Sequence, residues 1–393
     1  MTHYRQWSAA FASYFTILGL WTAFGPGALM AADPKAAPLA LAVITLVYFV
    51  ATPFVKALWN WLGFARTIVL MGAGVSISLC TASVAPQWLA WCVPVAFFFG
   101  SASYTLCETK MLEDLAQAGQ GHAFGRARKW GSFGFLAAAS LGGAAFSVGG
   151  VGHSFSIALG LCSAVYFFCC VALARASRDA APDRTLEAPH AVPAAVAPTA
   201  PAHVPNPNGY GTATLRRRVI GSAAVSVMRL AEAVATTWFG AYWLATGHSP
   251  LQTGLLCALP VAAEFLAMWK GGALLARYSA PAMMLFCCGI SALRWLATPM
   301  CSALWCAVPL QSVHAFTFGF FYPASLIWLK QAFGDSFFQI RYATESGARA
   351  LTAAVSYAAA SWLLAAWGYG AIFAISSALA VLTGLWWWRV VRG

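Results

Sequence analysis

Charged residues are scarce in this 393-residue sequence, where Asp, Glu, Lys and Arg together make up 9% and hydrophobic residues make up 61%. A water-soluble globular domain carries about 25% charged residues, so the composition excludes that class. The mean hydropathy of +0.71 agrees. Because each membrane-spanning helix needs about 20 mainly apolar residues, the chain has room for about a dozen spans. We therefore expect an all-α polytopic membrane protein.

Motifs for metal binding and redox chemistry are also lacking. The eleven cysteines all fall in apolar segments, alone or as adjacent pairs, with no Cys-x-x-Cys and no Cys/His cluster at metal spacing. We interpret them as small membrane-core residues and expect no disulfide, no metal and no cofactor. The first apolar run lacks a small-residue cleavage site and is long enough to span, so we expect a span there rather than a signal peptide.

Apolar runs separated by turn and charge signals predict twelve spans in two sets of six. The first set lies near residues 8–31, 37–59, 66–84, 88–110, 130–149 and 153–174, and the second near 219–245, 251–274, 281–299, 302–329, 343–366 and 369–388. The Pro/Ala-rich stretch 176–214 between them cannot bury enough apolar surface to fold. We predict an N-terminal six-helix bundle (1–175), a flexible linker (176–214) and a C-terminal six-helix bundle (215–393).

The net charge of +12 would suit nucleic acid, but the placement of the basic residues explains it differently. With the N-terminus inside, 19 of the 23 Lys and Arg fall on the inner side, only Lys35 falls in an outer loop, and Arg229, Arg294 and Arg349 fall within spans. Such asymmetry is the positive-inside pattern of membrane proteins. It predicts that both termini and the linker are cytoplasmic, that the bilayer is the partner of the surface, and that nucleic acid is not bound.

Two segments resemble those of a known transporter family. Residues 124–135 read FGRARKWGSFGF, and residues 310–321 read LQSVHAFTFGFF. They are similar to the F-G-R-x-R-x-[FW]-G-S-x-G-[FW] and L-x-x-x-H-x-x-T-F-G-x-[FY] segments of lactose-permease-like and phenylpropionate-permease-like members of the major facilitator superfamily. Glu264 and the Arg294–Trp295 pair also fall where that group carries an acid and an Arg-Trp pair. The resemblance covers essentially all twelve spans.

The resemblance implies a monomeric symporter of the bacterial inner membrane, in which two six-helix bundles rock around a midplane site by alternating access. It also implies that Arg128 binds the substrate and that Phe135, nearly two turns later on the same face, stacks on it. Spans one and seven line the pathway in this superfamily, so Trp21, Trp238 and Tyr242 are further substrate-binding candidates. Packing against lipid or neighbouring helices is the alternative for these aromatic residues.

The sequence departs from the family pattern at the acids. Thr317 stands where the lactose permease has a glutamate three residues after the span-ten histidine. The span-four acid that would pair with Arg128 cannot be aligned without a gap; Glu108 is nearest, and Glu113 and Asp114 are rivals. These departures put sugar specificity in question more than the transporter class.

Ionisable residues inside the predicted spans gather in the second half of the chain. Each costs at least about 2.5–3.5 kcal/mol at bilayer depth on insertion scales and therefore needs a partner or a function. There are seven: Arg229, Glu232, Glu264, Arg294, His314, Glu345 and Arg349. Arg229–Glu232 and Glu345–Arg349 are three and four residues apart, so each pair shares a helix face. We predict internal ion pairs there, and a gate near the cytoplasmic end that also involves Glu108.

Glu264, Arg294 and His314 have no opposite charge nearby on their own helices, so their partners must come from other helices or from the substrate. A carboxyl group in an apolar cavity can hold a proton near neutrality and release it when an arginine approaches, and histidine titrates in the same range. We therefore predict that these three residues couple transport to protons. The alternative is a buried hydrogen-bond network that only fixes helix packing.

The function that these features favour is proton-coupled import of a small organic solute. Arginines that reach the cavity favour a carboxylate, because guanidinium binds carboxylate bidentately, and the resemblance implies an aromatic acid as one candidate. Import of a siderophore, sugar or nucleoside and efflux of drugs or metabolites by proton antiport remain alternatives. A polytopic membrane enzyme is disfavoured because the outer loops carry almost no catalytic side chains, so we expect no enzymatic activity.

Overall fold

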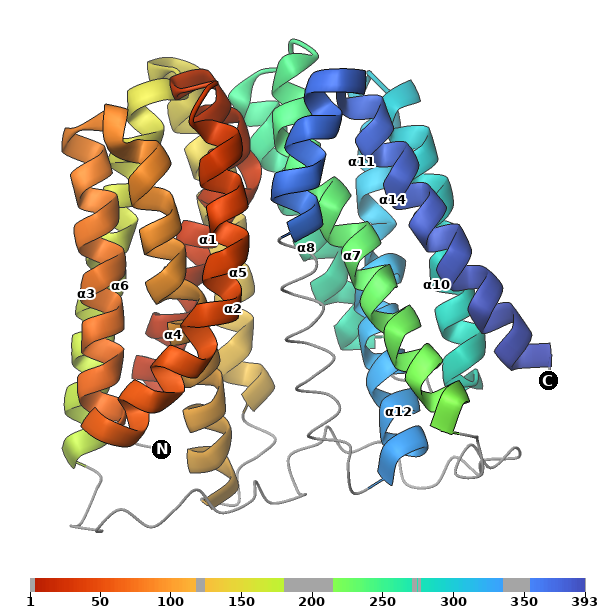
Figure 1. Cartoon of the computed structure of the whole chain (residues 1–393), viewed down its shortest axis with the longest axis horizontal. Helices are drawn as coiled ribbons and strands as arrows, with labels where there is room; N and C mark the ends of the chain where they lie inside the picture. Colours follow the sequence, from red (N-terminus) through yellow and green to blue (C-terminus); the bar gives the residue numbers. More distant parts are fainter. Residues whose placement is uncertain are drawn as a thin grey trace. The chain divides into compact units, whose positions relative to one another are not determined.

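The computed structural model describes residues 4–117, 124–179, 215–270, 274, 277–334 and 354–392. Throughout these ranges the regular structure is helical and no strand occurs (Figure 1). Ten of the helices found there are long and apolar enough to cross a membrane. The prediction of an all-α polytopic membrane protein is therefore confirmed.

The chain clusters into two compact units, of which the first comprises residues 1–199 together with 249–254. Its helices are α1 (Tyr4–Ala32), α2 (Ala37–Leu62), α3 (Phe64–Val84), a short 3-10 turn η1 (Pro86–Trp88), α4 (Leu89–Gln117), α5 (Phe124–Gly149) and α6 (Gly152–Asp179). Each of the six α-helices covers one of the six expected spans. In this unit α1 packs against α5 and α6, α3 packs against α4 and α6, and α2 packs against α4.

Small residues let α1 and α5 approach each other closely. A Cβ atom at Gly19 would lie 2.6 Å from the carbonyl oxygen of Phe135, and one at Gly134 would collide with the carbonyl oxygen of Ala12. Without hydrophobic attraction between helices in lipid, this kind of backbone contact is a main source of helix association. The two glycines therefore fix how α1 and α5 pack.

The second unit comprises residues 200–248 and 255–393. Its elements are α7 (Leu215–Ala245), α8 (Pro250–Lys270), α10 (Ala280–Ala297), the 3-10 turn η5 (Thr298–Met300), α11 (Leu304–Ser312), the π-helix η6 (Ala315–Phe320), α12 (Phe321–Phe333), the π-helix η8 (Ala354–Ala359) and α14 (Ala360–Arg392). The first turn of α8 clusters with the first unit. The expected tenth span is thus built from three elements, α11, η6 and α12.

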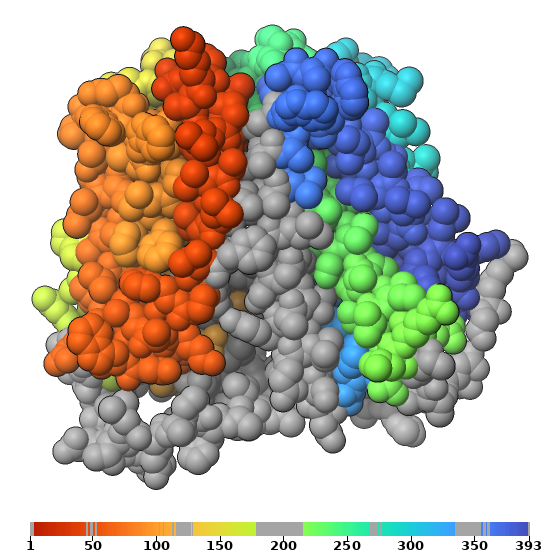
Figure 2. Space-filling model, viewed as in Figure 1, coloured from red at the N-terminus to blue at the C-terminus, as the bar shows by residue number. Residues whose placement is uncertain are grey.

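Element α14 contains the end of the expected eleventh span and the whole of the twelfth. Its backbone leaves the helical region at Gly368, where φ is +72° and a side chain would be strained. Figure 1 shows the chain reversing direction within α14, and the two blue arms form much of this face of the second unit in Figure 2. The reversal falls between the expected eleventh and twelfth spans. Residues 343–353 of the expected eleventh span lie outside the described ranges.

The outer faces of the spans carry large apolar side chains that are exposed, among them Ile77, Phe168, Leu293 and Trp362. Inside the second unit, α10 packs against α14 and α12 around a core that includes Met228, Cys287, Trp328 and Trp387. Helices that are apolar on both sides suit a protein whose outer solvent is lipid.

One expectation about the cysteines is wrong. A disulfide joins Cys301, in the connection between α10 and α11, to Cys306 in the first turn of α11, with their Cα atoms 5.8 Å apart. The other nine cysteines are free and lie within helices. The connection between spans nine and ten is only a few residues long, and the residues around Cys301 and Cys306 are apolar. The hydropathy pattern therefore does not show a loop there. Apolar surroundings alone therefore did not separate a loop cysteine from a membrane-core cysteine.

The close contact of α1 with α5 gives a test of the packing. We expect Gly134→Ala to lower the unfolding temperature of the purified protein, because the added methyl group meets a backbone carbonyl that cannot move cheaply; overpacking of this kind costs about 1–3 kcal/mol. The matched control is Gly289→Ala on α10, where nothing lies within 4 Å of the new Cβ atom. That variant should be as stable as the parent or slightly more so. Equal stability of the two variants would contradict the close packing.

Candidate functional site

Arg294 is buried in the second unit with only 2% of its surface exposed. On α10 it shares one face with Ser291, Trp295 and Thr298, which follow the 3-, 4- and 7-residue spacing of an amphipathic helix, whereas neighbouring Leu293 is exposed. The guanidinium carbon lies 4.1 Å from the ring centroid of Trp295. The helix thus turns its polar stripe into the bundle and its apolar stripe outward.

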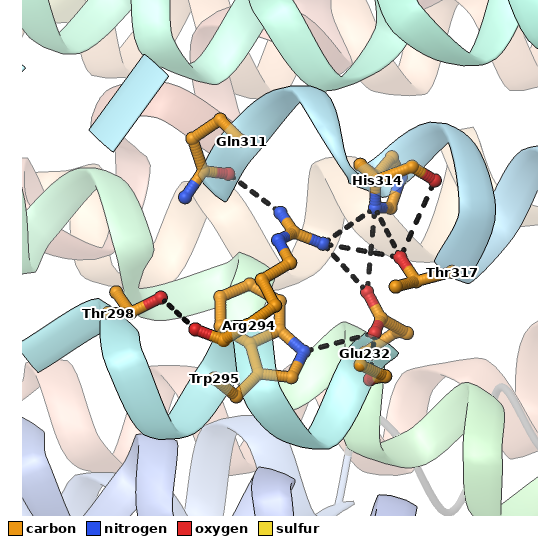
Figure 3. Close-up of polar contacts among 8 residues, drawn as sticks. Glu232, Arg294, Trp295, Thr298, Gln311, His314 and Thr317 are labelled. Carbon is orange, nitrogen blue, oxygen red and sulfur yellow. Dashed lines mark hydrogen bonds and ion pairs between the residues drawn. The ribbon is translucent and has the colours of Figure 1, made fainter. Parts of the chain in front are cut away.

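Four acceptors from two other segments surround the Arg294 guanidinium. Nη1 donates to Glu232 Oε2 on α7 at 3.0 Å and lies 2.8 Å from His314 Nδ1 and 3.3 Å from Thr317 Oγ1 on span ten. Nη2 donates to Gln311 Oε1 at 2.7 Å. Figure 3 shows the side chains of Gln311, His314 and Thr317 turned toward the guanidinium. We call these five residues the Arg294 cluster.

Glu232 is the carboxylate of this cluster and is 5% exposed. Besides the bond from Arg294, its Oε1 accepts from Trp295 Nε1 at 3.0 Å and from the hydroxyl of Ser291. A carboxyl group that only accepts, from three donors, is in its ionised form. The expected Arg229–Glu232 ion pair is therefore corrected: Glu232 pairs with Arg294, while the Arg229 guanidinium lies over the Tyr322 ring at 5.0 Å.

The contact between Arg294 and His314 determines the protonation of the imidazole. An arginine has no acceptor and never gives up its charge in proteins, so the nitrogen that receives its hydrogen bond must carry a lone pair. His314 is therefore neutral in this arrangement, with its proton on Nε2. The same Nδ1 lies 3.4 Å from Glu232 Oε2 and 3.2 Å from Thr317 Oγ1. The Arg294 cluster consequently holds one negative and one positive charge and is neutral overall.

The structure brings together two of the three residues predicted to couple protons. Arg294 and His314 are in contact, and their acidic partner comes from another helix, but it is Glu232 rather than Glu264. Glu264 is half-buried on α8, and its Cα lies 3.5 Å from the position of a Cβ atom at Gly319. Sequence reasoning missed Glu232 because its spacing to Arg229 suggested a local pair. The signal that could have identified it is that Glu232, on another predicted span, has the charge opposite to that of Arg294.

The predicted substrate-binding aromatic residues are buried in helix packing. Trp21 packs edge-on against Phe97 at 5.2 Å, and Phe135 is 8% exposed beside Gly19 of α1. Further, Trp238 donates to the carbonyl oxygen of Ser356, and Tyr242 packs among aromatic residues of α14. Trp21 also lines a cavity of the first unit together with Tyr14 and Leu159, and the substrate role of all four aromatic residues stays a prediction.

The remaining predicted residues lie near or beyond the limits of the described part. Glu108 accepts a hydrogen bond from Tyr104 at 2.9 Å on α4, and its former rival Asp114 pairs with Lys110 at 2.7 Å. The side chains of Arg128 and Glu113 are outside the described set, and Glu345 and Arg349 lie outside the described ranges. The predicted gate therefore stays a prediction.

The buried pair makes a strong prediction about stability. We expect Glu232→Gln to lower the free energy of unfolding by about 3–5 kcal/mol, because it leaves a buried guanidinium without its counter-charge. Removing both charges in Glu232→Gln/Arg294→Gln should recover part of that loss. Denaturation of the purified protein in detergent measures both. The control Asp114→Asn breaks the partly exposed pair with Lys110 and should cost about 0–1 kcal/mol; a similar loss from both single variants would contradict the burial argument.

Comparison with solved structures shows the same fold in transporters of distant sequence. The crystal structure of the nucleoside transporter NupG matches with a TM-score of 0.74 and 15% identity over 100% of both chains. A bacterial homologue of the human lysosomal transporter Spinster matches with a TM-score of 0.71 and 12% identity, over 99% of this chain and 96% of that one. A bacterial homologue of the iron transporter ferroportin gives 0.70 and 10% over 98% of both chains. At these identities the likeness establishes the fold alone.

The sequence comparisons place the chain in a family. No curated protein matches the sequence. The profile of the MFS_1-like family matches residues 30–380, which is nearly the whole chain. The predicted resemblance and the all-α major facilitator fold are thereby confirmed. The chain belongs to the MFS_1-like family and is a membrane transporter of the major facilitator type.

Proposed function

We propose that this chain is a proton-coupled secondary transporter that imports a small organic carboxylate, of which an aromatic acid is the candidate that the family resemblance suggests. One observation carries the proposal: Arg294 Nη1 occupies the lone pair of His314 Nδ1 while it pairs with Glu232. A group that can bind a proton is thus blocked by a cation that also pairs with a carboxylate.

The proton and Arg294 compete for the same atom. Protonation of His314 at Nδ1 would place a hydrogen where Nη1 now donates, so the guanidinium must withdraw first. The imidazole could then donate to Glu232 Oε2, which lies 3.4 Å away. Alternatively, Glu232 takes the proton once Arg294 has left it. In either case movement of one guanidinium switches the cluster between a proton-free and a proton-bearing state, which is what a coupling site requires.

Charge balance favours an anionic co-substrate. The proton-free cluster is neutral, so one added proton gives a net charge of +1 in a buried site, which is costly in a low-dielectric interior. A carboxylate bound nearby would offset that charge and make proton binding easier. By linkage the proton would then strengthen carboxylate binding by the same factor. Symport of a proton with a carboxylate follows from this reciprocity.

Neutral substrates are the main alternative within import. NupG is a nucleoside transporter, and a nucleoside or sugar would leave the positive charge of the protonated cluster uncompensated. Efflux by proton antiport would instead need the solute and the proton to exclude each other, as two cations would. The net-neutral resting cluster supports the carboxylate more than either alternative.

Two carboxyl variants separate the coupling group from its neighbour. We expect Glu232→Gln to abolish uphill accumulation driven by a proton gradient in liposomes, because the variant lacks the carboxylate that pairs with Arg294. Exchange that needs no gradient should stay measurable. Glu264→Gln on α8 is the matched control, an acid of the same type outside the Arg294 cluster, and it should keep accumulation. The reverse pattern would restore Glu264 as the proton carrier and remove Glu232.

We also propose that both termini face the cytoplasm, across the inner membrane of a bacterium. The inner-side excess of Lys and Arg supports this orientation. The disulfide supports it independently, because disulfides persist in oxidising compartments such as the periplasm and are rare in the cytosol. Cys301 lies in the connection between spans nine and ten, and Cys306 lies in the first turn of α11, at the end of these spans that is opposite the basic loops.

A membrane-impermeant maleimide polymer tests this orientation in intact cells. We expect no labelling of Cys301 or Cys306 until an impermeant reductant is added, and then a two-step mass shift that disappears in Cys301→Ser/Cys306→Ser. In that cysteine-pair background, Ser177→Cys at the end of α6 should react only after the membrane is permeabilised. If the reduced pair needs permeabilisation and Ser177→Cys does not, the orientation is inverted.

A further inference from the structure

Helix α10 surrounds the Glu232 carboxylate with donors from one of its faces. The hydroxyl of Ser291 and the indole Nε1 of Trp295 both donate to Oε1, the latter at 3.0 Å. Arg294 Nη1 donates to Oε2 at 3.0 Å. Positions 291, 294 and 295 share one face of a helix, and Figure 3 shows the indole of Trp295 turned toward Glu232. One helix therefore binds both oxygens of a carboxylate that belongs to another helix.

The oxygen Oε1 offers no room for a proton. It already accepts from two donors, and an indole N–H can only donate, so a proton on Oε1 would point at another hydrogen. Trp295 has little freedom to turn away, because it is fully buried and its ring stacks on Phe373 with centroids 5.8 Å apart and planes 7° apart. The guanidinium carbon of Arg294 also lies over the Trp295 ring. Oε1 is thus closed to protonation.

The oxygen Oε2 has a single donor and faces the imidazole. Arg294 Nη1 donates to it, and His314 Nδ1 lies 3.4 Å away. The same Nη1 also occupies the lone pair of Nδ1. When the guanidinium withdraws, two acceptors are left facing each other, and one proton between them satisfies both. A proton that enters the Arg294 cluster therefore binds between Nδ1 and Oε2.

The hydrogen bonds to Oε1 decide which of these two atoms keeps the proton. Donors that bind the charged form of a carboxyl group favour that form, and the donors on Oε1 stay in place when the guanidinium leaves. Exposure points the same way, because 11% of the His314 side chain is exposed, against 7% for Glu232 and 1% for Arg294. The imidazole is thus the member of the three that a proton reaches most readily.

We propose that Ser291 and Trp295 are positioning residues that keep the carboxylate of Glu232 ionised. The transported proton is then carried by His314 at Nδ1. This inference rests on the proposed function, in which either of the two groups takes the proton. In the step, the hydrogen bond from Arg294 Nη1 to Nδ1 breaks, Nδ1 gains the proton and donates a hydrogen bond to Oε2, and no other bond changes. The proton leaves when the guanidinium returns to Nδ1.

Other charged groups on the helices packed around the cluster have partners or positions of their own. Arg229 of α7 lies over the ring of Tyr322, and Glu264 of α8 lies beside Gly319. The remaining lysines and arginines stand at the ends of α7, α8, α12 and α14. Among the side chains that the structure describes there, phenols and thiols, neutral at physiological pH, complete the set: Tyr242, Cys257, Cys287, Cys288, Tyr322 and Tyr369. Within the described part of the chain, Glu232 is therefore the carboxylate that contacts His314.

Infrared difference spectra of the detergent-purified protein, recorded between about pH 8 and 5, test this without a proton gradient. A protonated carboxyl group has a C=O band that a carboxylate lacks, and imidazole ring bands report the protonation of histidine. We expect wild-type protein to show an imidazole signal that is lost in His314→Gln, and no carboxylic acid band from Glu232. Ser291→Ala and Trp295→Phe should each produce such a band, which shifts in frequency when Glu232→Asp is added.

Matched variants show whether the band comes from the lost donor or from looser packing. Trp387→Phe changes an equally buried indole of α14 whose Nε1 has no partner in the described part of the chain. Ser377→Ala removes a buried hydroxyl that donates to the backbone carbonyl of Ala292. Neither variant should produce a carboxylic acid band. Ser291→Thr keeps the donating hydroxyl and should retain the wild-type spectrum.

The outcomes distinguish a failure of this inference from a failure of the proposed function. A carboxylic acid band from Glu232 in wild-type protein, or no imidazole signal from His314, overturns the inference even where uptake into liposomes follows the proton gradient; this holds whether or not the variants fold. Folded Ser291→Ala and Trp295→Phe proteins without the band overturn the positioning role. An imidazole signal without a Glu232 band, in protein whose uptake ignores the gradient, upholds His314 as the protonated group and rejects proton-coupled import.

Discussion

The need to surround a buried guanidinium shapes the second unit. Arg294 keeps its positive charge at any physiological pH and is 2% exposed, so acceptors and a negative charge must reach it from other helices. Glu232 on α7 supplies the charge, and Gln311, His314 and Thr317 on span ten supply lone pairs. The positions of α7, α10 and span ten relative to one another follow from this requirement, and any change in the charge of the cluster must disturb all three.

The irregular backbone of span ten is where that requirement is met. Pro309 lies within α11, the helix stops after Ser312, and a π-helix follows from Ala315 to Phe320. A π-turn accommodates an extra residue and widens the helix, which is frequent at functional sites. Here the irregular stretch carries or adjoins Gln311, His314 and Thr317, all of which turn to one guanidinium, while Phe318 stays stacked on His314. On a regular α-helix, with about 100° per residue, these three positions would cover roughly 120° of the circumference, whereas here all three side chains reach one guanidinium.

The fold was predictable from the sequence, whereas the partners within the site were not. Hydropathy located the spans because the solvent around them is lipid, and that constraint acts on each helix separately. The burial of Arg294 was predictable for the same reason. Which acid would meet it depends on how helices are rotated against each other, and the local spacing of Arg229 and Glu232 suggested a different pair. The disulfide between Cys301 and Cys306 was not predictable either, because the short connection beside these cysteines is as apolar as the spans that it joins.

The threonine in the tenth span has a consequence for what this transporter can carry. Thr317 stands where the resembling lactose permease has a glutamate, and here it accepts from Arg294 as a neutral group. Among the described residues, Glu232 is then the cluster's one carboxylate, balanced by Arg294. A second carboxylate could absorb a proton and leave the site neutral for an uncharged sugar. With one carboxylate, a proton bound as we propose would leave an unbalanced positive charge, and an anionic solute would supply the missing negative charge.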